Sequence, residues 1–467
     1  MKKLFCFLAS VVLSAVMLFA GCSLLGADGI DGRDGKDGQN VTIDDIYNKY
    51  VSEHGEISFE DFLKEYLNYT DSELEDAVSL RAVINRSLMS GVTILTRFSY
   101  TTHRPTAQVS HKIFTGSGVI VWLDKAAGDA YVVTNAHVIY DDTSDSTYST
   151  DIRLYLYGQD VGGVNYILLN NSITQDENYR ISAEIAGASV NYDIALLKVT
   201  GSSVLKRSDA VAVSNKEDVA AALNDSFVAD QYPVVGETVY AIGNASAEGM
   251  SASSGIISKD SENIEVSLSD SNENLNFSYR VLRITAPINH GNSGGALYNT
   301  AGKIVGIVNA KDEGEDIDNM GYALPANAVR RIILSMYDNA NKTITGANGK
   351  KYGVSKAFLN IQTVISDSYA RLGEDGIAVI YELVRVNSVD GLPAKNVLQV
   401  NDILVSAKLT SADGTVKEDI EIIRNFSLSE MLFSAREGDI LTLVIERDKS
   451  ETQVSITFTS NYFKYFE

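Results

Sequence analysis

The sequence predicts a mainly β protein with more than one domain, and three observations lead to that fold class. Its 467 residues suffice for two to four domains of about 100–200 residues each. From about residue 91, short runs rich in β-branched and aromatic residues recur between polar turns, a pattern typical of barrels or sandwiches. Helical spacing is limited to four short stretches, at 42–54, 58–68, 326–337 and about 427–434.

The first residues have the features of an export signal. Lys2 and Lys3 precede an apolar run, 4–20, that ends in small residues. The stretch Phe-Ala-Gly-Cys at 19–22 resembles the lipobox of bacterial lipoproteins, which implies that residues 1–21 are removed and that Cys22 carries lipid. The remaining chain would then be anchored to the outer face of the bacterial cell membrane. An uncleaved membrane anchor, or a free cysteine beside an ordinary cleavage site, stays open.

Residues 22–82 are predicted to separate this anchor from the folded part. Glycine recurs at every third position from Gly26 to Gly38, with acidic residues between and no proline. A collagen helix favours proline and needs many more triplets, so we expect a flexible acidic tether over 22–40, with collagen-like assembly as the alternative. Capped helical patterns at 42–54 and 58–68 predict a short helical spacer over 41–82. A small partner-binding module is the alternative for this segment.

The region 83–340 is predicted to form a β domain. Its candidate strands are 92–95, 118–122, 130–134, 152–157, 194–199, 238–242, 255–258, 264–266, 279–284 and 304–308. The helix at 326–337 follows, because its apolar residues share one face. The polar stretch 339–349 contains Asn-Gly and is predicted to be a linker.

Composition excludes several classes of function. The formal net charge of −22 argues against a large phosphate-binding surface, so no nucleic-acid partner is expected. Cys6 and Cys22 are the two cysteines, too few for a disulfide framework once the leader is removed. The chain has neither C-x-x-C nor H-E-x-x-H, so we expect no metal and no cofactor. Apart from the N-terminal run, no long apolar stretch indicates a multipass membrane protein.

Three short motifs indicate nucleophilic catalysis. His137 follows a predicted strand, Asp193 begins another, and Ser293 lies in a glycine-flanked turn. A serine hydroxyl is a weak nucleophile that needs a base, and the base needs an acid to orient it. His137 would therefore accept the proton of Ser293, while Asp193 would hold the imidazole. Gly291 permits a turn that aims its N–H, with that of Ser293, at the substrate carbonyl oxygen.

The order of these residues along the chain separates two serine-hydrolase folds. Gly-x-Ser-x-Gly also occurs in α/β-hydrolases, where a histidine follows the serine. All five histidines precede Ser293, so that fold is excluded; they are His54, His103, His111, His137 and His290. The order His, Asp, Ser, with spacings of 56 and 100 residues, favours a double β-barrel serine protease.

With these motifs the chain resembles the HtrA/Deg family of trypsin-like serine proteases. The resemblance rests on Thr-Asn-Ala-His-Val, Asp-Ile-Ala-Leu-Leu-Lys-Val, Gly-Asn-Ser-Gly-Gly-Ala-Leu and Gly-Tyr-Ala-Leu-Pro, and runs from about residue 85 to the end. It implies a chymotrypsin-like double β-barrel, with His137, Asp193 and Ser293 as the catalytic triad. It also implies an oxyanion loop formed by Gly291, Asn292 and Ser293. The strand that pairs with the substrate would be Ile307, Val308, Asn309 and Ala310. The acidic loop 311–320 would shape the pocket, and the protease domains would assemble as a homotrimer.

Two departures from the family pattern lie near this loop. Thr285 stands where the family often has Asp, and His290 where it often has Pro. His290 is expected to be a plain surface residue, with an altered pocket rim or pH sensitivity as the alternative. Pro287 and Ile288 precede the loop and line the predicted primary pocket, which has no carboxylate for Lys or Arg. We therefore expect cleavage after small or medium aliphatic residues.

Residues 350–460 resemble a PDZ domain, which binds an extended peptide at a sheet edge. The resemblance places the peptide-binding loop at Tyr352, Gly353 and Val354, where a glycine lets backbone groups approach the ligand. Asn401 departs from the family pattern, which has glycine there. A β domain that only packs on the protease is the alternative.

Together these features predict a serine endopeptidase of the cell envelope that cleaves misfolded or unfolded proteins. Exposed C-terminal peptides would regulate it through the PDZ-like domain, and Cys22 would tie it to the membrane. The first alternative is a non-enzymatic chaperone or peptide-binding scaffold, against which the intact triad argues. The second is an adhesin, for which only the first 80 residues speak.

Overall fold

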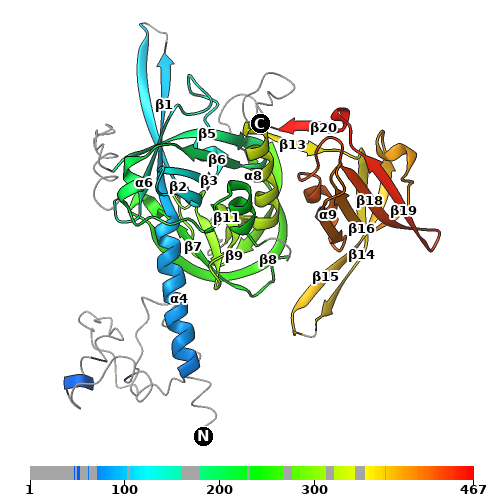
Figure 1. Cartoon of the computed structure of the whole chain (residues 1–467), viewed down its shortest axis with the longest axis horizontal. Helices are drawn as coiled ribbons and strands as arrows, with labels where there is room; N and C mark the ends of the chain where they lie inside the picture. Colours follow the sequence, from blue (N-terminus) through cyan, green and yellow to red (C-terminus); the bar gives the residue numbers. More distant parts are fainter. Residues whose placement is uncertain are drawn as a thin grey trace, which may run out of the picture. The chain divides into compact units, whose positions relative to one another are not determined.

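The structure is a computed structural model of the chain, and it describes residues 47, 50–52, 62, 71–102, 106–159, 179–228, 232–267, 276–311, 320–341, 353–373 and 375–466. The chain divides into two compact units, Met1–Val83 and Ile84–Glu467. Figure 1 shows the elements in sequence colours. Within the described residues, no helix is both long enough and apolar enough to cross a membrane.

The first unit is described at few positions. Tyr47, Tyr50 and Phe62 are helical, and the ring of Phe62 lies 5.3 Å from Tyr47 and 5.1 Å from Tyr50. These residues fall inside the two predicted spacer helices. Cys22, the signal and the tether over 22–40 lie outside the described residues. The predicted domain boundaries stay predictions.

A helix that the sequence analysis did not predict, α4 (Asp71–Ser90), joins the two units. Four of its first six residues are acidic and its apolar residues form only a weak stripe, so its helical period is hard to recognise. Within the second unit its end is fixed, because the Ser90 hydroxyl bonds the Ser87 carbonyl at 2.8 Å and the Tyr298 hydroxyl at 2.8 Å.

Two closed antiparallel barrels form the domain after α4, which confirms the predicted mainly β fold (Figure 1). The first barrel has the order β1-β2-β3-β6-β5-β4. Its strands are β1 (Gly91–Thr102), β2 (Gln108–Asp124), β3 (Asp129–Thr134), β4 (Asp151–Leu156), β5 (Ile181–Ser189) and β6 (Ile194–Val199). Alternate residues such as Val132, Leu154 and Leu197 fill its interior.

The second barrel has the order β10-β11-β12-β9-β8-β7. Its strands are β7 (Thr238–Gly243), β8 (Ser251–Ser267), β9 (Asn276–Ile284), β10 (Ala296–Asn299), β11 (Ile304–Lys311) and β12 (Gly321–Pro325). Val239, Leu282 and Val305 are among its interior residues. The two strands predicted at 255–258 and 264–266 are one strand, β8, because irregular register near Lys259 bends it without ending it.

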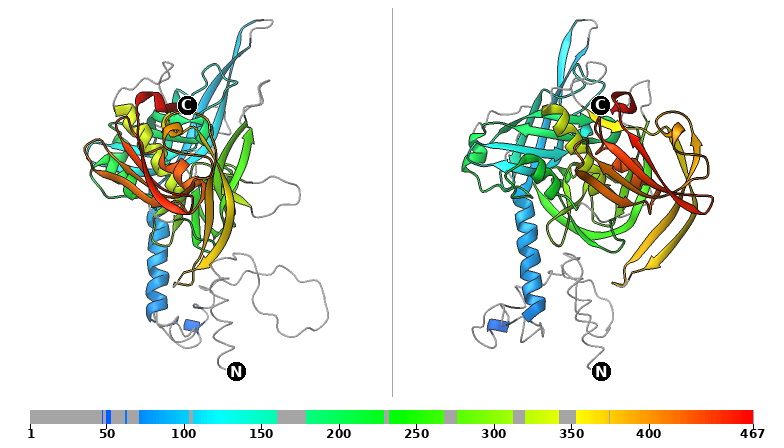
Figure 2. Two further views of the ribbon diagram at one scale, coloured as in Figure 1. Left: turned by 90° about the vertical axis from the view of Figure 1, so that its right-hand side faces the viewer. Right: turned by 45° about the vertical axis from the view of Figure 1, so that its right-hand side comes forward.

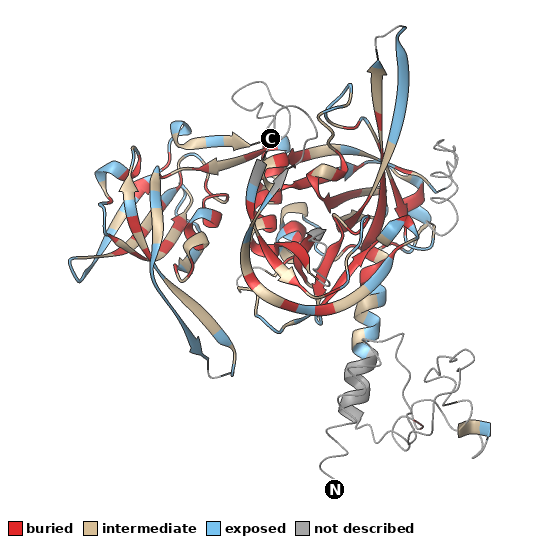
Figure 3. Ribbon diagram, turned by 180° about the vertical axis from the view of Figure 1, so that it is seen from behind, coloured by how far each residue is buried: buried red, intermediate tan, exposed pale blue. Residues whose placement is uncertain are grey.

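A shared apolar cluster joins the barrels. It includes Val121 and Leu196 from the first barrel, Ile307 from the second, and Ile333 and Met336 from helix α8 (Ala326–Asn341). Figure 3 shows buried residues concentrated on the barrel strands and α8. The predicted helix at 326–337 is confirmed and runs four residues further. Strand β5 was not predicted, since its alanines and Gly187 have low strand propensity.

Shorter helices complete the two-barrel domain. They are η1 (Ala136–Val138), η2 (Val190–Tyr192), α6 (Ser203–Arg207), α7 (Val219–Asp225) and η3 (Ala245–Ala247). Ser202 caps α6 and Asp218 caps α7, each accepting a hydrogen bond from an N–H of the first turn.

Residues 353–466 form two further sheets around their own core. Strand β14 pairs with β15 in a long hairpin, seen in Figure 2, and the larger sheet has the order β14-β15-β16-β18-β19 with β17 beside β16. The smaller sheet is β13 with β20. The elements are β13 (Val354–Ala357), β14 (Ile361–Leu372), β15 (Ala378–Val389), η4 (Ala394–Asn396), β16 (Ile403–Thr410), β17 (Val416–Glu421), α9 (Asn425–Met431), β18 (Ile440–Arg447), β19 (Ser450–Thr457), η5 (Ser460–Tyr462) and β20 (Phe463–Phe466).

Candidate active site

The structure brings His137 and Asp193 together as a bonded pair. Asp193 is buried, and its Oδ2 lies 2.8 Å from His137 Nδ1. Its Oδ1 accepts the backbone N–H of His137 at 2.9 Å. Two bonds from one residue to one carboxylate fix the imidazole orientation and leave Nε2 as the ring nitrogen for a proton from elsewhere.

Local structure explains why these two residues meet. His137 lies in η1, directly after β3, and Asp193 lies directly before β6, the strand that pairs with β3. Asp193 has φ of 49°, a left-handed conformation that Asp tolerates better than most residues. The Nδ2 of Asn135 donates to the Asp193 carbonyl oxygen at 2.8 Å and so fixes this turn.

Two opposing effects act on the pKa of His137. Burial lowers the pKa, since it disfavours the charged ring. The negative charge of Asp193 and its hydrogen bond raise it, and together they outweigh burial. The pKa of His137 therefore lies above its ordinary value of 6.5. A histidine raised in this way is a stronger base for the proton of a serine.

Ser293 lies in the turn before β10, and glycines stand two residues before it and one residue after it. Gly291 has φ of 95°, and a Cβ there would lie 2.2 Å from the carbonyl oxygen of Asn244. Gly294 has φ of 85°, and a Cβ there would lie 2.2 Å from the carbonyl oxygen of Ser117. The turn therefore packs backbone against backbone at both positions.

The same turn leaves two backbone donors without an acceptor. The His290 carbonyl accepts the N–H of Ser246 at 2.7 Å, so the Gly291 N–H points away from that loop across the planar peptide. The Asn292 N–H is used, since it donates to the Asn289 carbonyl at 3.1 Å. No described residue accepts from the N–H of Gly291 or of Ser293. Of the predicted oxyanion loop, these two N–H groups are free to bind an oxyanion.

The hydroxyl of Ser293 bonds to Asn309 in this structure. Its Oγ donates to the Asn309 carbonyl oxygen at 2.9 Å, and no hydrogen bond joins it to His137 within the described part of the chain. The Asn309 side chain meanwhile donates from Nδ2 to Asp193 Oδ2. Asn309 therefore touches both Ser293 and Asp193, and it brings the predicted triad to one place.

A bulge gives Asn309 this position. The pairing of β11 with β12 shifts between Val308 and Ala310, so Asn309 is the extra residue. A bulge re-aims one side chain, here toward the buried carboxylate. Tyr279 from β9 supports the amide, since its hydroxyl donates to Asn309 Oδ1 at 3.2 Å. Sequence reasoning assigned Asn309 to substrate pairing and missed this role; a lone buried amide within an apolar strand is the signal that could have found it.

Ser117 is a second residue that sequence reasoning missed. It lies on β2 of the first barrel, and its Oγ donates to the Gly291 carbonyl at 2.6 Å. The same oxygen accepts the N–H of Asn244 at 2.8 Å, and the Ser117 N–H donates to the Ser293 carbonyl at 2.8 Å. Ser117 therefore links the first barrel to the loop that carries the oxyanion donors. A serine between two glycines of a predicted strand is a weak signal for such a link.

The register of β11 narrows the segment that can pair with a substrate. Val308 uses both backbone groups, since its N–H bonds the Gly295 carbonyl and its carbonyl accepts the Gly294 N–H, each at 2.9 Å. Ile307 pairs on both sides, with β10 and β12. Among the described residues, the β10-facing edge of β11 has no backbone partner from Asn309 onward, where the Asn309 carbonyl accepts only a side-chain hydroxyl, that of Ser293. The side chain of Ala310 lies outside the description. Pro287 is exposed and Ile288 is half-buried.

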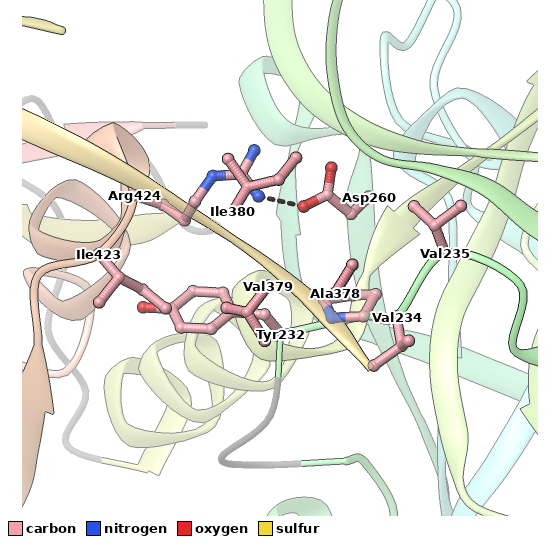
Figure 4. Close-up of a pocket in the computed structure, with 10 residues that line it drawn as sticks. Tyr232, Val234, Val235, Asp260, Ala378, Val379, Ile380, Ile423 and Arg424 are labelled. Atoms are coloured by element: carbon pink, nitrogen blue, oxygen red, sulfur yellow. Dashed lines mark hydrogen bonds and ion pairs between the residues drawn. The ribbon is translucent and has the colours of Figure 1, made fainter. Parts of the chain in front are cut away.

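A separate pocket lies away from these residues. Figure 4 shows it between the 232–235 loop, the start of β15 and the 423–424 segment, with the ion pair of Asp260 and Arg424 at one side. It contains no triad residue, so it has no part in the chemistry described above. Among the described residues, no group of three His, Cys, Asp or Glu side chains could hold a metal ion.

Comparison with known proteins supports the trypsin-like fold of the two barrels. Residues 116–307 match the model of the trypsin-like peptidase domain. The chain is 25% identical over 392 residues to "Serine protease HtrA-like" of Staphylococcus aureus strain MRSA252, covering 83% of this chain and 42% of that protein. The relative of strain NCTC 8325 is 24% identical over 393 residues, with the same shares. The chain thus spans less than half the length of these curated relatives.

Two solved structures are also similar. An HtrA-type protease, AlgW with decapeptide, aligns with 80% of this chain and 97% of its own at 17% identity and a TM-score of 0.44. The serine endoprotease from Yersinia pestis aligns with 83% of this chain and 98% of its own at 19% identity and a TM-score of 0.40. By the two barrels and the domain match, the chain carries a trypsin-like peptidase domain.

Proposed function

We propose that this protein is an HtrA-like serine endopeptidase that cleaves unfolded polypeptides by a His137–Asp193–Ser293 triad. The observation that carries the proposal is the convergence of three elements at one place. They are a bonded His–Asp pair, a serine in contact with the same asparagine as that pair, and two N–H groups free for an oxyanion. The domain match and the HtrA-like relatives support it.

The chemistry needs one local rearrangement. Rotation about the Cα–Cβ bond of Ser293 would take its hydroxyl from the Asn309 carbonyl to His137 Nε2. The oxygen then attacks the scissile carbonyl while His137 accepts the proton, and Asp193 stabilises the imidazolium. The N–H groups of Gly291 and Ser293 bind the oxyanion. His137 returns the proton to the leaving amine, an acyl-enzyme forms, and water releases it by the same steps.

The substrate and location extend this proposal. An apolar rim of Pro287 and Ile288 favours small or medium aliphatic residues before the cleaved bond. The open edge from Asn309 onward can pair with an extended substrate backbone, which folded proteins seldom offer. We extend the proposal to an exported location and a lipid at Cys22, on the N-terminal sequence pattern. Trimer assembly and regulation through residues 350–460 are proposed from the HtrA/Deg and PDZ resemblance alone.

The test is active-site labelling of the full chain in mild detergent with a fluorophosphonate probe, together with cleavage of unfolded casein. We expect labelling and cleavage by the wild type, and loss of both in Ser293→Ala and His137→Ala, by up to about 10⁶-fold in rate. Ser110→Ala, an exposed serine on β2, is the matched control and should keep both.

The alternative function is a chaperone or peptide-binding scaffold without catalysis. It is favoured by one observation, the Ser293 hydroxyl bonded to Asn309 and not to His137. A wild type that binds unfolded casein but neither labels nor cleaves it, with or without added peptides, would replace the enzyme by this function.

A further inference from the structure

Strand β13, which follows the predicted peptide-binding loop, has a partner on both edges. On one edge it pairs antiparallel with β20, from Val354 opposite Phe466 to Ala357 opposite Phe463. On the other edge the Ser335 hydroxyl of α8 bonds the N–H and carbonyl of Ser355, at 3.2 and 3.1 Å. A peptide can therefore add to β13 only by taking the place of one of these partners.

Gly353 is shaped to receive β20. Its φ is 133°, and a Cβ there would lie 2.5 Å from the Phe466 carbonyl oxygen and 2.6 Å from a ring carbon of Tyr465. Any side chain at this position would collide with β20. The glycine predicted to admit a peptide backbone admits β20 in this structure. Tyr352 lies outside the described residues.

The side chains of β20 make specific aromatic contacts. Phe466 stacks on Phe358 with ring centroids 5.9 Å apart, and the ammonium of Lys464 lies 4.3 Å from the centroid of the same ring. Phe463 faces the domain core, with its ring 5.9 Å from Phe458. Side chains from both faces of β20 therefore make contacts that depend on the pattern aromatic-Lys-aromatic-aromatic.

β20 is nevertheless a short and partly exposed strand. The pairing covers four residues in a sheet of two strands, and such small sheets are marginal by themselves. Lys464 is exposed, and the other three residues are only half-buried. A competing strand has therefore little to displace.

One ring connects β20 to the active site. Phe466 makes an edge contact with Tyr192, with centroids 5.4 Å apart, and Tyr192 is the residue before Asp193. Phe433, after α9, packs on the same tyrosine at 4.9 Å. The His137–Asp193 pair is intact in the structure in which β20 holds Tyr192 in this way.

We propose that the edge of β13 is a strand-binding site that β20 fills from within the chain. The ligand class is an extended peptide with the aromatic-Lys-aromatic-aromatic pattern of Phe463–Phe466. Occupancy supports the catalytic pair through Tyr192, so vacating the site lowers activity and an added peptide restores it. The activity part rests on the proposed function, whereas the binding part does not.

The test removes the pairing of β20 with one substitution. Lys464 lies opposite Lys356 in the pairing of β20 with β13. Two residues before it, the Tyr462 carbonyl accepts the Phe358 N–H at 2.7 Å. Because alternate residues of a strand direct their backbone groups to the same side, the Lys464 N–H also faces β13. Lys464→Pro removes an N–H directed at β13. Lys464→Ala keeps the backbone and loses only the contact with the Phe358 ring, so it is the graded companion. Glu451→Ala, at an exposed position on β19, is the control. The probe is a fluorescent peptide amide that copies residues 459–466, compared with a version in which both phenylalanines are alanine.

We expect Lys464→Pro to bind the aromatic peptide at least tenfold more tightly than the wild type or Glu451→Ala, with Lys464→Ala between them. The alanine peptide should not bind. Casein cleavage should fall severalfold in Lys464→Pro and recover with the aromatic peptide, but should not recover when Tyr192→Ala is added. A chain ended after Thr459 should behave like Lys464→Pro, which covers the case in which the proline disturbs folding.

Three results would overturn the inference: no binding to either altered chain, equal binding to the wild type, or equal binding of the alanine peptide. Binding is also measured with Ser293→Ala, where catalysis is absent. A positive binding result with an inactive wild type would keep the strand site and reject the proposed enzyme.

Discussion

The two barrels contribute to the site in different states of readiness. The first barrel supplies His137 and Asp193, already joined by a side-chain bond and a backbone bond. The second supplies Ser293, whose hydroxyl is turned to the Asn309 carbonyl. In the proposed triad, the His–Asp pair is therefore already joined, whereas the hydroxyl of the proposed nucleophile would have to turn from Asn309 to His137. The two barrels thus differ in how much must move before the proposed chemistry can begin.

The physical reason lies in how each barrel holds its residues. Asp193 is buried between two paired strands and accepts hydrogen bonds on both oxygens, so its position has no cheap alternative. Ser293 lies in a turn, and a serine hydroxyl can rotate between acceptors at little cost. The predictions that follow test this contrast, from the largest expected effect to the smallest.

Breaking the His–Asp pair should cost most. Asp193→Asn cannot stabilise the imidazolium and presents an N–H where an acceptor is needed, so kcat/KM should fall about 10⁴-fold. Steady-state cleavage of a peptide substrate measures this. Asp419→Asn, in an exposed ion pair with Lys408, is the control and should leave the rate unchanged. A loss below tenfold would show that the pair is not preorganised for catalysis.

Distorting the oxyanion loop should come next. Gly291→Ala would collide with the Asn244 carbonyl and displace one of the two free donors, so kcat should fall about 10²–10³-fold. Gly236→Ala is a matched control, because Gly236 has nearly the same φ, 93°, and nothing within 4 Å of its Cβ position. Both variants are assayed for fluorophosphonate labelling and peptide cleavage. Equal losses would attribute the effect to backbone strain and not to the loop.

Removing the amide that joins the two halves should have a moderate effect. Asn309→Ala deletes one hydrogen bond to the Asp193 carboxylate but keeps the backbone carbonyl that accepts from Ser293. Hydrogen bonds to charged groups contribute about 1.5–3 kcal/mol, so kcat should fall about 10- to 150-fold with KM unchanged. Because Asp193 would have one hydrogen-bond donor fewer, its negative charge should attract the proton on His137 more strongly, and the pKa of His137 should rise further.

Tyr279→Phe is the graded companion to that variant. It removes only the hydroxyl that bonds Asn309 Oδ1 and should lower kcat severalfold. An effect of Asn309→Ala on KM alone would instead assign Asn309 to substrate binding, as the sequence first indicated.

The smallest effect is a shift along the pH axis. The pKa of His137 lies above its ordinary value of 6.5. At any pH below this raised pKa the ring is mostly protonated, so it cannot act as a base. The acid limb of kcat/KM should therefore lie above pH 6.5, and Asp193→Asn should move it lower by removing the attracting charge. The same raised pKa stabilises the fold fully below about pH 6.5, and this contribution is lost as pH rises through the folded-state value. A limb at or below pH 6 in the wild type would contradict the pairing.

Much of the fold was predictable because its signals are local. Strands such as β3 and β6 carry short apolar runs, and α8 has an apolar face. Helix α4 and strand β5 were missed because their residues carry no strong period. The predicted break in β8 was wrong. The polar residues between 258 and 264 suggested two strands, but the irregular register near Lys259 only bends one continuous strand.

The sequence by itself predicted the residues of the proposed chemistry. A histidine after a strand, an aspartate before one and a serine among glycines each have a local signature, and their order along the chain excluded the competing hydrolase fold. Only the tertiary structure decided which partners complete them. Asn309 reaches Asp193 across 116 residues, Ser117 reaches Gly291 across 174, and β20 reaches β13 from the far end of its domain. Such contacts depend on a bulge, a barrel closure and a strand register, which arise when distant segments pack together and leave no period in the sequence.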